Sequence, residues 1–243
     1  MTSDLAQKAL AAYGGEELWS QLGSIEAEVS TKGWAFILKG RPYFKRARLF
    51  MEVHRPFCTI TPVGRQTQVS GVLDGPDVRL ENSRGEAIAR RENARAHFTF
   101  GRRLLYWDDL DMAYFANYAF WNYFAFPALL LREEIVWKDI SPHILQATFP
   151  DSLPTHSRVQ RFHLDAESGL LLQHDYTADI IGRFARAANV IVQHDQRDGV
   201  PYPSRRRVTP RTGGGLPLRW PVLIEITVHD CTFHRAGQTV AES

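Results

Sequence analysis

A short stretch of the chain, residues 114–126, is unusually rich in aromatic side chains. The segment 110–125 contains neither glycine nor proline, Pro127 follows it, and acidic residues at 108–111 precede it, where a helix N-terminus favours negative charge. We therefore expect a helix of about four turns. Its aromatic residues are Tyr114, Phe115, Tyr118, Phe120, Trp121, Tyr123, Phe124 and Phe126. Because they occupy every face, this cannot be a simple surface helix.

Two interpretations of the aromatic helix stay open. In the first, the helix is wedged against a sheet as ordinary core. In the second, part of it lines a ligand cavity, where Asn117, Asn122 and the tyrosine hydroxyls supply a few directional polar groups. The second interpretation places Tyr114, Tyr118, Trp121 and Asn122 beside a bound ligand.

The segments on either side of this helix predict other elements. Two short helices, separated by Gly14-Gly15 and with Ser3 as N-cap, are expected within 1–22. In later segments apolar and polar residues alternate in part, and turn signals separate these segments. Such segments predict β-strands. The expected strands are 24–38, 46–54 and 65–73, and in the C-terminal part (144–233) they are 144–149, 158–165, 170–179, 184–195, 202–210 and 218–233.

The short connections between these strands predict antiparallel neighbours. We expect a mainly β (α+β) fold, in which a single curved antiparallel sheet carries the helices on its concave side. The aromatic helix, 107–127, would then lie over the cavity. A chain of 243 residues is within the range of one large domain, so one domain spanning 1–243 is expected.

The composition argues against several classes of function. The chain has 29 Lys and Arg against 27 Asp and Glu, and a net charge of +2 is too small to favour a nucleic-acid partner. The segment 114–131 nearly reaches membrane-spanning length, but Asn117 and Pro127 interrupt it, so no integral membrane span is expected. No signal peptide is visible, and we expect a cytoplasmic protein in which Cys58 and Cys231 are buried thiols.

Metal and cofactor motifs are missing from the sequence. The nine histidines are scattered, without an H-E-x-x-H spacing, and the glycine triplet 213–215 lacks the lysine and the helix of a phosphate-binding loop. We therefore expect no metal and no cofactor. His229 and Cys231 share a strand face, so the sequence leaves a cross-strand site open as an alternative.

A histidine and a tyrosine are the first candidates for catalysis. Strand alternation places His174 and Tyr176 on one face with Leu170 and Leu172, and Asp175 on the other. In an apolar cavity, desolvation would shift the pKa values of His174 and Tyr176 and make them usable as general base and acid. The alternative is a core histidine that is hydrogen-bonded to a neighbouring strand.

Arg206 is the third catalytic candidate. On the next two strands, the nearest inward residues are Arg206 and either Asn189 or His194, depending on register. The guanidinium of Arg206 would hold a carboxylate or an enolate, because its donors form a rigid fork. The alternative is that the basic stretch 204–211 is a solvated outer surface.

Two regions of the chain resemble a known superfamily. The opening segment 11–19, followed by 24–30, resembles the start of lipoprotein-carrier-like proteins, the LolA-like superfamily. The pair 161–165 and 169–176 resembles its pattern of phenylalanine, any residue, leucine, aspartate, a turn and glycine-leucine-leucine. The resemblance implies an open half-barrel whose concave hydrophobic face, filled by helices, holds acyl chains. The carriers of that superfamily have an export signal that is not seen here, and the aromatic block suggests an aromatic or polycyclic ligand.

Three functional hypotheses follow. The first is a cytoplasmic protein that binds a bulky hydrophobic small molecule and promotes cofactor-free acid/base chemistry on it, as a cyclase, isomerase or lyase would. The second is a non-catalytic carrier of a lipid or another hydrophobic ligand. The third is an interaction protein whose aromatic block is only core. The sequence does not decide the oligomeric state.

Overall fold

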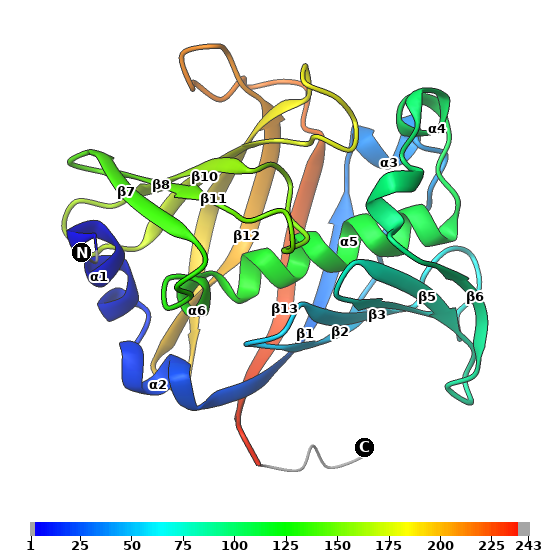
Figure 1. Ribbon diagram of the computed structural model, residues 1–243, viewed down its shortest axis with the longest axis horizontal. Helices are drawn as coiled ribbons and strands as arrows, with labels where there is room; N and C mark the ends of the chain where they lie inside the picture. The colour runs from blue at the N-terminus through cyan, green and yellow to red at the C-terminus, as the bar shows by residue number, and fades with distance from the viewer. Residues whose placement is uncertain (1–2, 238–243) are drawn as a thin grey trace.

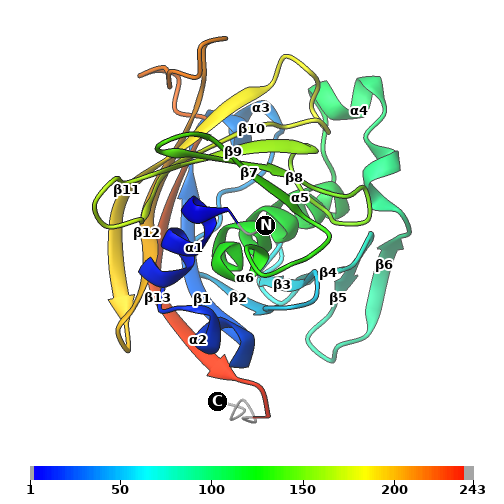
Figure 2. The same cartoon turned by 60° about the vertical axis from the view of Figure 1, so that its left-hand side comes forward.

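The computed structural model describes residues 3–237, and it contains one sheet of thirteen strands. The strands lie in the order β6-β5-β4-β3-β2-β1-β13-β12-β11-β10-β9-β8-β7, and each pairs antiparallel with its neighbours. The sheet curves around helix α5 and stays open between β6 and β7 (Figure 1, Figure 2). The predicted mainly β fold, an open half-barrel with helices on its concave side, is confirmed.

The strands are named in chain order. They are β1 (Leu22–Lys32), β2 (Ala47–Glu52), β3 (Phe57–Thr61), β4 (Ser70–Asp74), β5 (Asp77–Glu81), β6 (Ala87–Arg91), β7 (Val136–Ser141), β8 (Ile144–Thr148), β9 (Val159–Leu164), β10 (Leu171–Thr177), β11 (Arg186–Arg197), β12 (Val200–Pro210) and β13 (Ile224–Arg235). The helices are α1 (Asp4–Ala12), α2 (Glu16–Gln21), α3 (Trp34–Leu38), a 3-10 turn η1 (Ala94–His97), α4 (Phe100–Leu105), α5 (Asp109–Phe124) and α6 (Phe126–Leu129).

The first and last strands of the chain, β1 and β13, are neighbours at the centre of the sheet. β1 pairs with β13 over its whole length, and Ala27 lies opposite Cys231. β2 to β6 extend the sheet on the β1 side, and β12 to β7 extend it on the β13 side. The first and last strands of the chain therefore meet where the two halves of the sheet join.

The aromatic helix forms where the sequence predicts it, and a capping box starts it. The Asp108 carboxylate accepts a hydrogen bond from the Asp111 backbone N–H (2.8 Å), and the Asp111 carboxylate accepts one from the Asp108 N–H (3.1 Å). Arg91 and Arg102 each form ion pairs with both carboxylates. Asp111 is fully buried, so these two guanidinium groups compensate its charge.

The concave face of the sheet encloses α5. From Asp111 to its end, every residue of α5 is buried except Phe115, which is half-buried. The helix lies against β3, β4 and β5, where Gly71 leaves no room for a side chain: a Cβ there would be 2.6 Å from the Cβ of Ala113. The Asn117 amide donates to the Gly71 carbonyl (3.0 Å) and fixes this approach.

The structure differs from the predicted strands in three respects. Residues 65–69 and 218–223, which the sequence predicts as parts of strands, lie outside β4 and β13. The predicted strand 24–38 ends at Lys32, because Gly33 (φ +135°) turns the chain and residues 34–38 form α3. The strands β3, β5, β6 and β7 were not among those predicted. β6 and β7 are the open edges of the half-barrel and their residues are mostly exposed, so they lack the alternation of a half-buried strand.

Two further expectations concern cysteines and membrane spans. Cys58 and Cys231 are buried free thiols, as predicted. Within residues 3–237, no helix has both the length and the apolar character needed to cross a bilayer.

Candidate ligand-binding site

The inner faces of β10, β11 and β12 bring the predicted polar residues together. His174, Tyr176 and Arg206 are all buried, with at most 3% of each side chain exposed. His174 lies opposite Asn189 in the β10–β11 register, which selects Asn189 from the two alternatives that the sequence leaves open. Strand parity thus places the three predicted side chains in the interior.

The apolar residues that share the inner face of β10 with His174 differ from the prediction. A register irregularity between Leu171 and Gln173 shifts the alternation of β10. Leu171 is buried and Leu172 is 46% exposed, so the expectation that Leu172 shares the face of His174 is wrong. The bulge therefore changes which side chains of β10 point inward before the strand reaches His174.

A cluster of aromatic and imidazole rings surrounds the buried hydroxyl groups. The Tyr123 hydroxyl, from α5, lies 3.0 Å from Nε2 of His156 and 2.9 Å from the Tyr176 hydroxyl. The rings of His156 and Tyr176 are stacked with centroids 3.7 Å apart. The sequence singles out neither Tyr123, one of several tyrosines on the helix, nor His156, because only the folded loop before β9 brings His156 to the helix.

A second set of hydrogen bonds connects His174 to α5. Nε2 of His174 donates to Oε1 of Gln160 (2.6 Å), and the Gln160 amide donates in turn to Thr155. The Thr155 hydroxyl donates to Oδ1 of Asn122 (3.1 Å). This chain of polar groups runs from the loop before β9 to the centre of the half-barrel.

Burial sets the protonation states in this interior. Burial, with a smaller contribution from the charge of Arg95, lowers the pKa of His156 to about 3. Burial likewise lowers the pKa of His174 well below its usual value. It raises the pKa of Tyr123 to about 12 and that of Tyr176 well above its usual range. Near neutral pH both imidazoles are uncharged and both hydroxyls keep their protons.

Arg206 is the charged group of this interior. Its guanidinium carbon lies 4.8 Å from the centre of the Tyr123 ring, and its Nη2 donates to the Tyr123 carbonyl oxygen (3.1 Å). Within residues 3–237 no carboxylate pairs with Arg206, and its buried Nη1 has no hydrogen-bond partner. Burial lowers its pKa to about 10, which still leaves it protonated at neutral pH.

Other buried polar atoms near this cluster also have no partner. They include both amide atoms of Asn189, Nδ1 of His156 and the Thr209 hydroxyl. The Asn189 amide lies near enough to the Tyr123 hydroxyl to lower its pKa slightly, yet neither of its atoms meets hydrogen-bond geometry. Because buried polar groups in native proteins normally have partners, a ligand or water is expected at these atoms.

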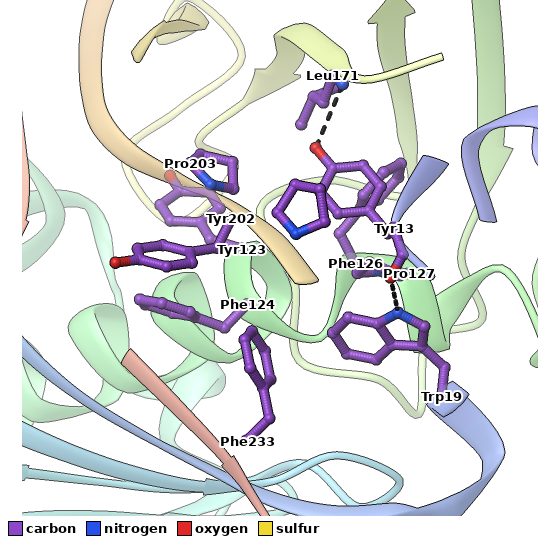
Figure 3. A pocket seen from close by; sticks show the side chains of 11 residues that line it. Tyr13, Trp19, Tyr123, Phe124, Phe126, Pro127, Leu171, Tyr202, Pro203 and Phe233 are labelled. Carbon is purple, nitrogen blue, oxygen red and sulfur yellow. Dashed lines mark hydrogen bonds between the residues drawn. The ribbon is translucent and has the colours of Figure 1, made fainter. Parts of the chain in front are cut away.

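Two hollows border the interior. The first lies among the rings of Tyr13, Trp19, Tyr123, Phe126, Tyr202 and Phe233 (Figure 3). Its free volume of about 10 Å³ is only about enough for one water molecule. Trp19 of α2 donates to the Tyr13 carbonyl oxygen (2.8 Å), which holds the α1–α2 hairpin over this hollow.

The second hollow is a cleft of about 450 Å³, a size that accommodates a small ligand. It lies between η1 and the loop before β9, and its lining includes Arg95, Tyr114, Thr155, Arg158 and Asp179. Arg95 donates to the Thr155 carbonyl oxygen (2.6 Å) and lies 3.7 Å from the Asp179 carboxylate. Thr155 therefore connects this cleft to the chain of polar groups that ends at His174.

The four predicted ligand-binding residues occupy different places. Tyr114 lines the larger cleft. Asn122 is bound to Thr155 in the cleft wall, and Tyr118 is fully buried with an unpartnered hydroxyl. Trp121 is fully buried, lines neither hollow and donates to the Glu52 carbonyl oxygen (2.9 Å). Their role in binding stays a prediction.

Metal ligands do not gather anywhere in the described chain. Among residues 3–237, no three His, Cys, Asp or Glu side chains are placed to hold one ion together.

Comparisons with known proteins identify the fold. No protein-family profile matches the chain, and no curated protein sequence matches it. Three solved structures are similar over nearly the whole chain. A LolA superfamily protein from Nitrosomonas europaea has 11% identity and a TM-score of 0.50, covering 96% of this chain and 93% of that one.

The other two structures agree with the first. An outer membrane lipoprotein-sorting protein domain from Vibrio parahaemolyticus has 13% identity and a TM-score of 0.52, covering 97% and 93% of the two chains. A DUF1329 family protein from Desulfovibrio piger has 12% identity and a TM-score of 0.50, covering 98% and 95%. At such identities the similarity concerns the fold alone, and that fold is LolA-like, as the sequence resemblance implied.

Proposed function

We propose that this protein binds an amphiphilic carboxylate, with the apolar body of the ligand in the aromatic interior and its carboxylate at Arg206. The observation that carries the proposal is the buried guanidinium of Arg206, which has no counter-charge in the described chain and an unused Nη1 donor. Burying an unpaired charge is expensive, so proteins rarely keep one without a partner. A ligand carboxylate would supply both the charge and the hydrogen-bond acceptor.

The surroundings of Arg206 favour one negative charge on an otherwise apolar molecule. The side chains next to it include Tyr123 and Tyr13, which also line the aromatic hollow. Asn189, on the neighbouring strand, offers an amide that has no partner. One acid group is all that these donors can satisfy, and aromatic rings would surround the remainder of the ligand.

The aromatic hollow would have to expand to admit such a ligand. Its present volume of about 10 Å³ describes a closed state. The α1–α2 hairpin covers it through Trp19, so displacement of this hairpin would open a path from outside (Figure 3). The similarity in fold to an outer membrane lipoprotein-sorting domain supports the proposal of a carrier.

The proposal is tested by comparing an acid with the matching alcohol. Hexadecanoic acid should bind more tightly than hexadecanol to the wild-type chain in titration calorimetry. In Arg206→Met, which keeps the length of the side chain, the preference for the acid should fall by about 10- to 100-fold, because a charge-assisted hydrogen bond is lost. Arg205→Met, on the outer face of the same strand, is the matched control.

Three outcomes would contradict the proposal. They are equal binding of acid and alcohol, an unchanged preference in Arg206→Met, and no binding of either probe. A polycyclic carboxylic acid, tested in the same way, would show whether the aromatic interior prefers rings to an alkyl chain.

A second candidate function is acid/base catalysis on the bound molecule, such as cyclisation, isomerisation or dehydration. It is favoured by the position of His174 and Tyr176 beside Arg206 on one inner face. His174 would accept a proton, Tyr176 would donate to a carbonyl or enol oxygen, and Arg206 would stabilise negative charge. His174→Gln should then abolish turnover of a true substrate but keep its binding, whereas a carrier would show no turnover in either form.

The cytoplasmic location expected from the sequence also stays a prediction.

A further inference from the structure

Exposed apolar side chains gather at one end of the half-barrel. Among residues 3–237, eleven of the seventeen large hydrophobic residues that are exposed belong to four segments: 33–45, 98–107, 181–187 and 211–223. The eleven are Trp34, Ile37, Leu38, Tyr43, Phe100, Leu105, Tyr106, Phe184, Leu216, Leu218 and Trp220. In Figure 1 these segments, α3, α4 and the loops before β11 and β13, all lie at the top of the molecule, and Figure 2 agrees. We call this surface the rim.

The rim is one continuous surface. The rings of Trp34 and Trp220 are in edge contact, with centroids 6.4 Å apart, and the backbone N–H of Ala35 donates to the Leu223 carbonyl oxygen (2.9 Å). Nζ of Lys39 donates to the Leu104 carbonyl oxygen (2.9 Å), which joins α3 to the end of α4. The remaining segment, 181–187, joins 211–223 where the Arg211 N–H donates to the Arg186 carbonyl oxygen (3.1 Å).

The charges of the rim have one sign. Its four segments contain nine basic residues and no aspartate or glutamate, whereas the whole chain has a net charge of only +2. The nine are Lys39, Arg41, Lys45, Arg102, Arg103, Arg183, Arg186, Arg211 and Arg219. Arg41 and Arg102 pair with the aspartates at the start of α5. Within residues 3–237, the exposed Lys45, Arg183, Arg186 and Arg219 form no ion pair.

We propose that the rim docks on the surface of a bilayer that contains anionic lipids. Exposed tryptophan, tyrosine and leucine side chains surrounded by arginine and lysine are typical of surfaces that lie in the headgroup region. The aromatic and aliphatic groups enter the boundary of the acyl chains, while the basic groups attract the anionic headgroups. The inference goes beyond the proposed function and holds whether or not a carboxylate binds at Arg206.

The sign of the charges argues against a second copy of this chain as the partner. A two-fold dimer built on this surface would place basic residues against basic residues, which is unfavourable. The rim also lies close to the larger cleft: Arg95 and Asp179 line that cleft and immediately precede two of the rim segments. A bilayer on the rim would thus lie beside an opening into the half-barrel.

Flotation with vesicles tests the proposal on the full chain without added ligand. One set of vesicles is pure phosphatidylcholine, and the other contains about one third phosphatidylglycerol. The chain should float with the anionic vesicles, float much less with the neutral ones, and be released at high salt because screening weakens the attraction. If each basic residue contributes about fivefold to partitioning, loss of two arginines in Arg183→Glu with Arg219→Glu should lower it by at least about 25-fold, and the two new carboxylates lower it further by repulsion.

Matched variants separate docking from general effects of charge and hydrophobicity. Trp34→Ala with Trp220→Ala removes two exposed rings of the rim and should lower partitioning at least tenfold. Arg90→Glu, an exposed residue of β6, and Val136→Ala, an exposed residue of β7, lie on the opposite edges of the sheet and should have no such effect. All these side chains are exposed, so circular dichroism and thermal melts should match the wild type.

Three outcomes would overturn the proposal. No partitioning into anionic vesicles, or equal losses in the rim variants and the controls, would show that the rim is not a membrane-docking surface. Light scattering that finds a dimer which the rim variants dissociate would identify a second copy as the occupant instead. A chain that binds no carboxylate but partitions through the rim would refute the proposed function and leave this inference standing.

Discussion

Mild acidification should destabilise this fold because two imidazoles are buried without charge. His156 is fully buried, with a pKa lowered to about 3, and His174 is buried, with a pKa well below its usual value. In the unfolded chain both would titrate near pH 6.5. A lowered folded pKa means that the unfolded state binds protons first, so the stabilising contribution is full above pH 6.5 and is lost as the pH falls below it.

The size of the effect follows from this difference in proton binding. At pH 5 the unfolded His156 gains about 2 kcal/mol from protonation that the folded state cannot match, and His174 adds to this loss in the same direction. For a chain of this length a loss of about 2 kcal/mol lowers the melting temperature by about 4 to 8 °C. The Asp108 carboxyl titrates below pH 5, because burial raises its pKa but hydrogen bonds to Arg91, Arg102 and the Asp111 backbone outweigh burial and hold that pKa well below the usual value.

The assay is denaturant unfolding at pH 8, 6.5 and 5 at constant ionic strength. The free energy of unfolding should fall by at least about 2 kcal/mol between pH 8 and pH 5. His174→Gln, which can still bond to Gln160, should weaken the pH dependence, and His143→Gln, at an exposed turn, is the matched control. A wild-type chain that is equally stable at pH 8 and pH 5 would refute the reasoning.

Two further predictions concern packing and thiol chemistry. Gly71→Ala should lower the free energy of unfolding by about 1–3 kcal/mol, because the new methyl group meets Ala113. Gly101→Ala in α4 places its methyl group in open space and should raise the free energy of unfolding slightly. Chemical denaturation of both variants measures these changes. Cys58 and Cys231 should react with a thiol reagent only after denaturation, since burial raises the pKa of both thiols, and fast labelling of the native chain would contradict this.

The sequence predicts those parts of the fold that depend on local pattern. The run 110–125 predicts α5, and strand alternation places His174, Tyr176 and Arg206 in the interior. Alternation predicts the wrong faces before the bulge at Gln173, because a shift of one residue moves every side chain on one side of the bulge to the opposite face of the sheet.

The remaining parts depend on contacts between distant segments. His156 meets Tyr123 only because the loop before β9 folds onto α5, and no spacing in the sequence encodes that approach. The unpaired state of Arg206 is likewise a property of the assembled interior, since acidic residues are plentiful along the chain. The edge strands β6 and β7 escape prediction because exposed strands have no alternating burial.

The pairing of β1 with β13 has a consequence for synthesis of the protein. A ribosome makes β1 before every other strand and β13 after all of them, yet these two strands form the central pair of the sheet. Until β13 emerges, β1 and β12 each present a free edge on the nascent chain, and such edges pair readily with strands of other chains. A chaperone that covers those two edges during translation would therefore protect the protein at its most vulnerable stage, and a chain interrupted before residue 224 would leave the two halves of the half-barrel unjoined.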